Sequence, residues 1–184
     1  MSILDLRVLG DPVLRKETEI VESVTGDIRK LIDDMFETMY AAEGIGLAAP
    51  QVGRTERVTV MDIEGQKFAL INPEIIDSKG TVRMEEGCLS IPDIFGDVTR
   101  PDRVTIRALD ENGKEIEFHA MDMLARCLQH EIDHLHGKLF VDYLSMLKRK
   151  AALAKWETLK GDYPNYIRKV KLEKKGPHHS EGEL

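Results

Sequence analysis

The segment "CLQHEIDHLHG", residues 127–137, concentrates one thiol, three imidazoles and two carboxylates in eleven positions. Apolar residues in and before it recur at three- and four-residue steps, which is the spacing of one face of an α-helix. We therefore predict a helix over residues 122–139, and its few exposed polar positions indicate that it is central and buried. Its apolar side consists of Leu124, Leu128, Ile132 and Leu135.

The rest of the chain predicts short strands between two more helices. Residues 26–43 have a helical period, and glycines 44 and 46 end it. Asn112-Gly113 separates two β-rich runs, as in a hairpin. The sequence therefore predicts an α+β fold, with mostly antiparallel strands packed around the buried helix and with an N-terminal and a C-terminal helix. The expected strands cover 57–63, 67–73, 80–91, 97–110 and 114–120, and the last helix covers 143–159.

Length and composition suit one globular domain. The chain has 184 residues, of which 42% are hydrophobic and 32% are charged, so it can form a sizeable core. We expect a single domain over residues 1–165. Residues 166–184, which end in "KKGPHHSEGEL", are polar and turn-rich, and we expect them to form a flexible C-terminal tail.

The charge balance argues against several classes of partner. The formal net charge is -7, which disfavours specific DNA binding. No apolar stretch reaches the roughly 20 residues of a membrane span, and the N-terminus does not resemble a signal peptide. We therefore expect no membrane partner and a cytoplasmic location. Two cysteines far apart in sequence predict metal binding or catalysis rather than a disulfide framework.

His130 and His134 lie four positions apart, so a helix places both imidazoles on one face. With Glu131 between them they form the HExxH pattern, in which two histidines bind a metal ion and the glutamate is a general base. Two partly exposed histidines without a function are the simpler alternative. The intervening glutamate and the apolar surroundings favour the metal site.

A catalytic site of this kind needs a third protein ligand. Cys127 lies on the same helix face, whereas Cys88 follows a glycine in "EEGCLSIP". Three ligands from one straight helix would spread along its axis, which favours Cys88. Buried cysteines are also common in apolar cores, so the spacing alone leaves both candidates open.

Three segments together resemble the motifs of the peptide deformylases. They are "GIGLAAPQ" (44–51), "EGCLS" (86–90) and "QHEIDHLHG" (129–137), and their order and separation also match. "LGDPVLR" and "GKLFVDYLS" extend the resemblance across most of the first 145 residues. It implies that the domain over residues 1–165 is catalytic.

The resemblance also implies roles for individual residues. Glu131 corresponds to the catalytic acid/base, and Gln51 and the Leu89 N–H correspond to donors facing the oxyanion. Ile45 and Gly46 correspond to the edge that pairs with the peptide, and Cys127 with Ile45 would line the methionine pocket. Arg100 would lie near the substrate backbone. The metal ligands would be Cys88, His130 and His134.

The implied activity is hydrolysis of the N-formyl group from the N-terminal formylmethionine of newly made proteins, a co-translational step of protein biosynthesis. The implied cofactor is one divalent metal ion, Fe²⁺, which Zn²⁺, Ni²⁺ or Co²⁺ could replace. The partners would be N-formylmethionyl nascent polypeptides and the ribosome, the latter through the basic C-terminal segment. Two alternatives remain at this point: a metallopeptidase of the HExxH type and a non-catalytic metal-binding protein.

Overall fold

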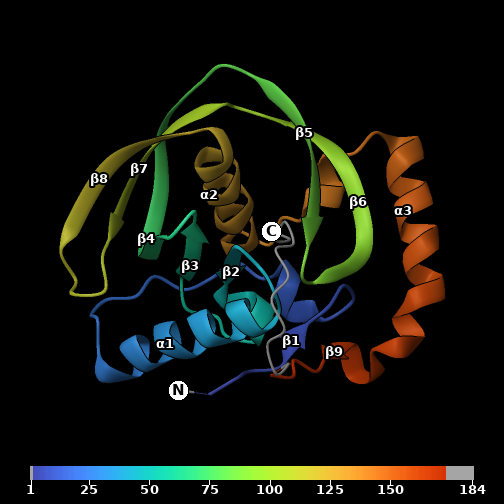
Figure 1. The fold of residues 1–184 in the computed structure, drawn as a ribbon, viewed down its shortest axis with the longest axis horizontal. Helices are drawn as coiled ribbons and strands as arrows, with labels where there is room; N and C mark the ends of the chain where they lie inside the picture. The colour runs from blue at the N-terminus through green and yellow to red at the C-terminus, as the bar shows by residue number, and fades with distance from the viewer. Residues whose placement is uncertain (1, 173–184) are drawn as a thin grey trace.

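The central helix, α2 (Asp122–Leu135), packs on an antiparallel sheet of five strands. The structure is a computed structural model and describes residues 2–172. The strand order is β2-β3-β4-β7-β8, so β2 is an edge strand. Figure 1 shows α2 in the middle of the molecule, with β4, β7 and β8 along one side. The strands span Gly46–Ala48 (β2), Val58–Ile63 (β3), Gln66–Lys79 (β4), Arg103–Leu109 (β7) and Glu115–Met121 (β8).

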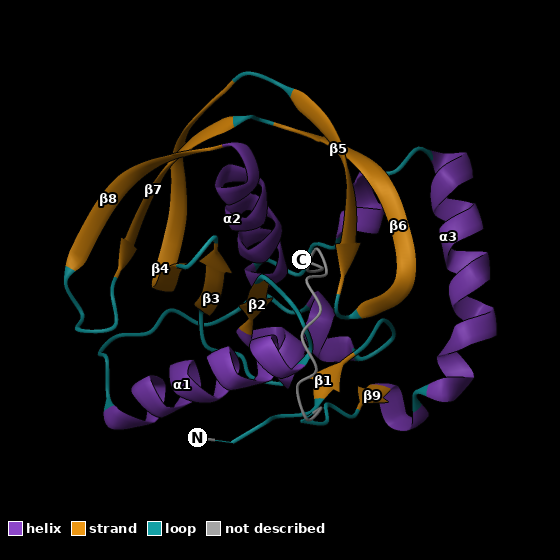
Figure 2. Ribbon diagram, in the orientation of Figure 1, coloured by secondary structure: helices purple, strands orange, loops and turns teal. Residues whose placement is uncertain are grey.

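A separate two-stranded ribbon lies on the other side of α2 (Figures 1 and 2). It consists of β5 (Val82–Cys88) and β6 (Ile91–Arg100), which pair antiparallel. Strand β4 has 14 residues, and its pairing with β7 contains two register shifts. Bulges of this kind bend a strand. The sheet and the ribbon therefore enclose α2 between them.

The predicted hairpin at Asn112 is confirmed. Strands β7 and β8 are antiparallel, and Asp110 N–H donates to Lys114 O across the turn at 2.9 Å. Gly113 has φ +79°, a left-handed conformation that suits glycine. The short connection keeps β7 next to β8, and β8 runs directly into α2.

The three predicted helices are present, and the α+β class is confirmed. Helix α1 (Gly26–Ala41) has Thr25 as its N-cap, and helix α3 (Met146–Leu159) has Ser145. Helix α2 ends four residues earlier than the sequence predicted, at Leu135. The reason lies at Gly137, which has φ +69° and whose added Cβ would stand 2.5 Å from the Arg15 carbonyl oxygen.

The apolar side of α2 forms one core with the sheet. Leu128 and Ile132 pack with residues such as Met61, Leu70 and Ile106 from three strands. The opposite side of the helix carries the histidines and faces the ribbon. This division places polar groups of α2 deep inside the molecule.

The two ends of the described chain meet in a third, two-stranded sheet. Strand β1 (Leu6–Arg7) pairs antiparallel with β9 (Ile167–Arg168), which lies inside the range expected for the tail. Residues 173–184 of the tail predicted over residues 166–184 lie outside the described residues. Among residues 2–172, no helix combines the length and the apolar character that crossing a membrane requires. The short helical turns are η1 (Pro12–Arg15), η2 (Ala49–Val52), η3 (Phe140–Tyr143), η4 (Lys160–Asp162) and η5 (Pro164–Tyr166).

Candidate metal centre and active site

Three side chains from two elements converge between α2 and the ribbon. Cys88 ends β5, and His130 and His134 lie one turn apart on α2. Their ligand atoms all lie within 4.8 Å of one another, and each residue is at most 2% exposed. The Cys88 Sγ atom is 3.3 Å from His134 Nε2. Cys127 does not belong to this group of ligand atoms.

The donors fit one metal ion. Donors that bind a single ion at about 2.0–2.3 Å stand roughly 3.5 Å apart in tetrahedral geometry. His130 Nε2 is buried and has no hydrogen-bond partner among residues 2–172, so it is available to an ion. Burial lowers the pKa of His134 well below 6.5. The imidazole is therefore neutral, which is the form that binds metals. A thiolate with two imidazoles favours zinc or iron.

The opposite nitrogen of His130 is held by a buried carboxylate. His130 Nδ1 lies 2.9 Å from Glu86 Oε1, so a proton on Nδ1 is bound there and Nε2 keeps its lone pair. Two arginines bind the same carboxylate. Arg100 donates from Nη2 at 2.9 Å and from Nε at 2.6 Å, and Arg126 donates from Nη1. All four side chains are at most 3% exposed.

These contacts keep Glu86 ionised. Burial opposes the charge, but hydrogen bonds from His130 and Arg100 outweigh it and lower the pKa of Glu86 to about 2. Arg126 also donates to the carbonyl oxygens of Val98 and Val82, at 3.1 and 2.9 Å. Arg126 therefore connects α2 to both strands of the ribbon by hydrogen bonds.

Arg100 connects this carboxylate to a second one. Its Nη1 donates to Asp133 at 2.8 Å. Tyr143 donates to the same Asp133 oxygen at 2.7 Å, and its ring lies 4.6 Å from the Arg100 guanidinium carbon. The structure thus places Arg100 behind His130, bound to two carboxylates. A contact of Arg100 with the substrate backbone stays a prediction.

Glu131 is the unpartnered carboxyl of the site. Both its oxygens are buried without a hydrogen-bond partner among the described residues. Burial, followed by the charge of Glu86, raises the pKa of Glu131 well above 4.5. A Cβ added at Gly46 would lie 2.5 Å from Glu131 Oε1 and 2.8 Å from Cys127 Sγ. The glycine therefore lets β2 approach the carboxyl closely.

The Gln51 side chain is oriented toward the thiol. Its Oε1 accepts from Ala48 N–H at 2.9 Å, which turns Nε2 toward Cys88 Sγ at 3.6 Å and Ser90 Oγ at 3.2 Å. Leu89, the other predicted oxyanion donor, follows Cys88 directly in the turn between β5 and β6. Both predicted donors therefore belong to segments that adjoin the thiol.

Cys127 lies on the side of α2 that faces β2. Its Sγ is 3.9 Å from Ile45 O, and both side chains belong to the same apolar cluster. Burial, followed by the charge of Glu131, raises the pKa of Cys127 well above 9.0. Cys127 is therefore a thiol, which suits an apolar lining better than a metal ligand.

The sequence did not identify two residues of this arrangement. Glu86 stands inside the quoted "EGCLS" segment, and a metal-binding histidine usually needs an acceptor for its second nitrogen. That rule could have suggested a carboxylate near Cys88. Arg126 gave no signal, because an arginine on a predicted helix is ordinarily exposed.

The chain is similar to proteins of one family. A family model described as polypeptide deformylase matches residues 3–150. A peptide deformylase of Alkalilimnicola ehrlichii is 56% identical over 163 residues, covering 86% of this chain and 92% of the relative. A crystal structure of a peptide deformylase from Legionella pneumophila superimposes with TM-score 0.84 at 47% identity, covering 87% of this chain and 96% of the other. Another, from Ehrlichia chaffeensis in complex with actinonin, gives TM-score 0.83 at 45% identity, covering 89% and 99%.

Proposed function

The chain belongs to the polypeptide deformylase family, and we propose that its Cys88, His130 and His134 hold the metal ion with which it acts. It is a hydrolase that removes the formyl group from the N-terminal methionine of newly made proteins. The observation that carries the metal assignment is the buried meeting of one sulfur and two ring nitrogens within 4.8 Å.

The chemistry of the ion follows from its ligands. When bound, a divalent ion lowers the pKa of a water molecule toward about 7 and polarises a carbonyl oxygen. We propose ferrous iron as the natural ion, as the resemblance to the family implies, with zinc, nickel and cobalt able to replace it. A thiolate with two imidazoles is compatible with iron. Activity of the iron form should then decay in air, while nickel or cobalt should preserve it. An iron form that is stable in air would contradict this assignment.

Glu131 is the proposed general acid/base. Its carboxylate takes a proton from the water that attacks the formyl carbon, and the carboxylic acid then gives that proton to the amine as the C–N bond breaks. The products are formate and a free N-terminus. The raised pKa of Glu131 makes its carboxylate a stronger base for the first of these two proton transfers.

Gln51 and Leu89 are the proposed donors to the oxygen that gains negative charge. The Ala48 N–H bond to Gln51 Oε1 leaves the Nε2 donor directed at the site. The Leu89 backbone N–H is the second donor. In comparable sites each donor of this kind is worth about 2.7–4 kcal/mol, because its dipole is fixed before charge develops.

The substrate peptide is proposed to pair with β2. An edge strand offers unpaired backbone groups to an extended peptide, and Gly46 begins this strand next to Glu131. Such pairing would bring the formyl group to the ion. The methionine side chain would then enter the apolar region lined by Ile45 and Cys127.

We further propose a cytoplasmic protein that meets its nascent chains at the ribosome. Helix α3 exposes Met146 and Leu147, at 89% and 79%, beside the basic residues Lys148, Arg149 and Lys150. Basic side chains attract RNA phosphates. Cosedimentation with ribosomes at low and high salt tests this contact, and salt-independent absence from the ribosomal pellet would contradict it.

Paired substrates test the reaction. Formyl-Met-Ala and unformylated Met-Ala-Ser are supplied to the metal-loaded protein, and formate and free amino acids are measured. Formate release from the first alone is expected, whereas cleavage of the second would indicate a metallopeptidase. Glu131→Ala should lose about 10²–10⁴-fold in kcat while retaining the metal. An unchanged kcat in that variant would overturn the role of Glu131.

A further inference from the structure

The turn between β5 and β6 consists of two buried residues, Leu89 and Ser90, exposed by 1% and 0%. It begins at the Cys88 thiol. It also carries the Leu89 N–H, which is one proposed oxyanion donor, and the Ser90 hydroxyl, which accepts from the other proposed donor, Gln51 Nε2, at 3.2 Å. The orientation of this turn therefore bears on both proposed oxyanion donors.

Both carbonyl oxygens of the turn are bound by distant parts of the chain. Ser90 O accepts from Leu9 N–H at 2.8 Å, near the N-terminus. Leu89 O accepts from Arg168 Nη1 at 2.9 Å, near the end of the described chain. The turn is thus fixed from outside the ribbon by two directed hydrogen bonds.

Arg168 is itself held in place by the pairing of the chain ends. Arg168 pairs with Leu6 in the β1–β9 ladder, and Val8 N–H donates to Tyr166 O at 3.0 Å. Figure 1 shows β9 beside β1, on the way from α3. The guanidinium therefore projects toward the turn from a strand with a defined register.

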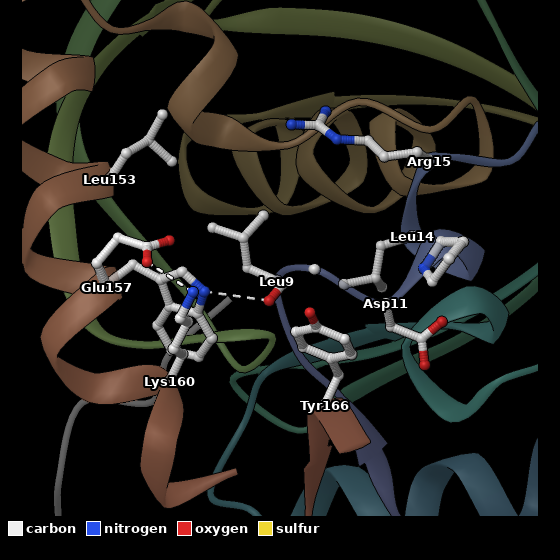
Figure 3. A pocket seen from close by; sticks show the side chains of 11 residues that line it. Leu9, Asp11, Leu14, Arg15, Leu153, Glu157, Lys160 and Tyr166 are labelled. Atoms are coloured by element: carbon white, nitrogen blue, oxygen red, sulfur yellow. Dashed lines mark hydrogen bonds and ion pairs between the residues drawn. The ribbon is translucent and has the colours of Figure 1, made fainter. Parts of the chain in front are cut away.

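The neighbouring contacts reinforce this position. A pocket of about 280 Å³ lies between the segment that follows β1 and helix α3, and Figure 3 shows the Tyr166 ring at its wall near Leu9. Gly10, with φ +112°, makes room for that ring, since an added Cβ would lie 2.4 Å from Tyr166 Cε1. The indole of Trp156, on α3, donates to Leu9 O at 3.1 Å.

We propose that Arg168 is a positioning residue for deformylation, which holds the Leu89–Ser90 turn in the orientation that the oxyanion donors require. Arg168 lies beyond residue 150, where the match to the family model ends. The inference rests on the proposed function, because it acts through Leu89 and Gln51. It means that a segment beyond the family match contributes to the rate through a single guanidinium.

Steady-state kinetics on three variants test the proposal. Arg168→Ala should lower kcat for formyl-Met-Ala about tenfold with KM nearly unchanged, because misdirected donors weaken transition-state binding alone. Arg168→Lys should recover most of the loss, since an ammonium also donates to a carbonyl. Lys169→Ala is the matched control: Lys169 is adjacent, and its ammonium pairs with Asp5 on the surface at 2.5 Å. It should retain the wild-type kcat.

Hydrogen exchange of the metal-free protein supplies a readout that does not depend on turnover. Amides of residues 86–91 should exchange faster in Arg168→Ala than in wild type, and at the wild-type rate in Lys169→Ala. A wild-type kcat in Arg168→Ala would overturn the proposal, as would equal losses in the two alanine variants. Absence of formate release by the wild-type chain would contradict the proposed function. Unchanged hydrogen exchange in Arg168→Ala would contradict the inference about Arg168, whatever the result of the formate assay.

Discussion

Helices α2 and α3 each have 14 residues, yet they differ in what surrounds them. Ten side chains of α2 are buried, including an arginine, a glutamate and two histidines, whereas Trp156 is the buried side chain of α3. Figure 1 shows the reason: α2 lies between the sheet and the ribbon, while α3 lies at the outer edge against β6.

The comparison shows that the same residue types have different consequences in the two places. Burying a charge around α2 costs free energy of folding unless an opposite charge lies beside it. Each buried charge there therefore needs a well-oriented partner. A charge on α3 is solvated and contributes little. Substitutions of polar residues should therefore have large effects near α2 and small effects near α3.

Glu86→Gln should have the largest effect. The amide cannot accept from Arg100, Arg126 and His130 together. It leaves Arg126 without a counter-charge and Arg100 with Asp133 as its remaining carboxylate partner. We expect a loss of about 3–5 kcal/mol in the free energy of unfolding. Metal affinity should fall about 10–100-fold as His130 loses its acceptor.

Urea unfolding and metal titration measure both effects of Glu86→Gln. Glu85→Gln is the matched control, because Glu85 is the preceding residue on β5 and is exposed. It should leave both quantities unchanged. Equal metal affinity in the two variants would show that the carboxylate behind His130 is dispensable.

Gly46→Ala should have the second largest effect. The new methyl group would overlap Glu131 Oε1 and Cys127 Sγ, so β2 or the carboxyl must move. Overpacking of this kind costs about 1–3 kcal/mol of stability, and displacement of Glu131 should lower kcat by up to about 10²-fold. Thermal unfolding and formate release measure these changes. Gly161→Ala, where no atom lies within 4 Å of the added Cβ, should be neutral; similar losses in both would refute the steric argument.

Asp142→Asn should have a moderate, pH-dependent effect. Burial opposes its charge, but hydrogen bonds from Arg15 and Leu139 N–H outweigh it and lower the pKa of Asp142 below 3.8. Stability from such a group is present above the unfolded pKa and is lost as pH falls through the folded pKa. We expect Asp142→Asn to lose about 1 kcal/mol at neutral pH and less near pH 3. Urea unfolding at both pH values would contradict this if the difference did not shrink.

Lys150→Ala, on the exposed side of α3, should have the smallest effect. Surface substitutions usually change the free energy of unfolding by less than about 0.5 kcal/mol. Formate release from a free peptide should not change either. A stability loss comparable to that of Gly46→Ala would contradict the expected difference between substitutions near α2 and substitutions on α3.

The sequence predicted the elements that local patterns determine. The helical period of residues 26–43 and the turn at Asn112-Gly113 correspond to α1 and the β7–β8 hairpin. The HExxH spacing placed His130 and His134 on one face of α2. Spacing alone did not decide between Cys88 and Cys127 as the third ligand. The structure brings Cys88 close to the two histidines, and its role as a metal ligand stays a prediction.

The features that the sequence did not predict depend on contacts between residues far apart in the chain. Arg126 lies on a helix whose period does not reveal that Glu86 will face it, and Arg168 lies in a segment expected to be flexible. Strands β1 and β9 have two residues each, too few for a periodic signal. Their pairing follows only once α3 has brought the chain end back to the N-terminus.

Metal analysis of anaerobically purified protein tests the central claim, that Cys88, His130 and His134 share one ion. The wild-type chain and the Cys88→Ala and Cys127→Ala variants are compared by elemental analysis, with circular dichroism to verify that each is folded. One divalent ion per chain is predicted for the wild type and for Cys127→Ala, and none for folded Cys88→Ala. Full metal content in Cys88→Ala, or its loss from folded Cys127→Ala, would contradict the account.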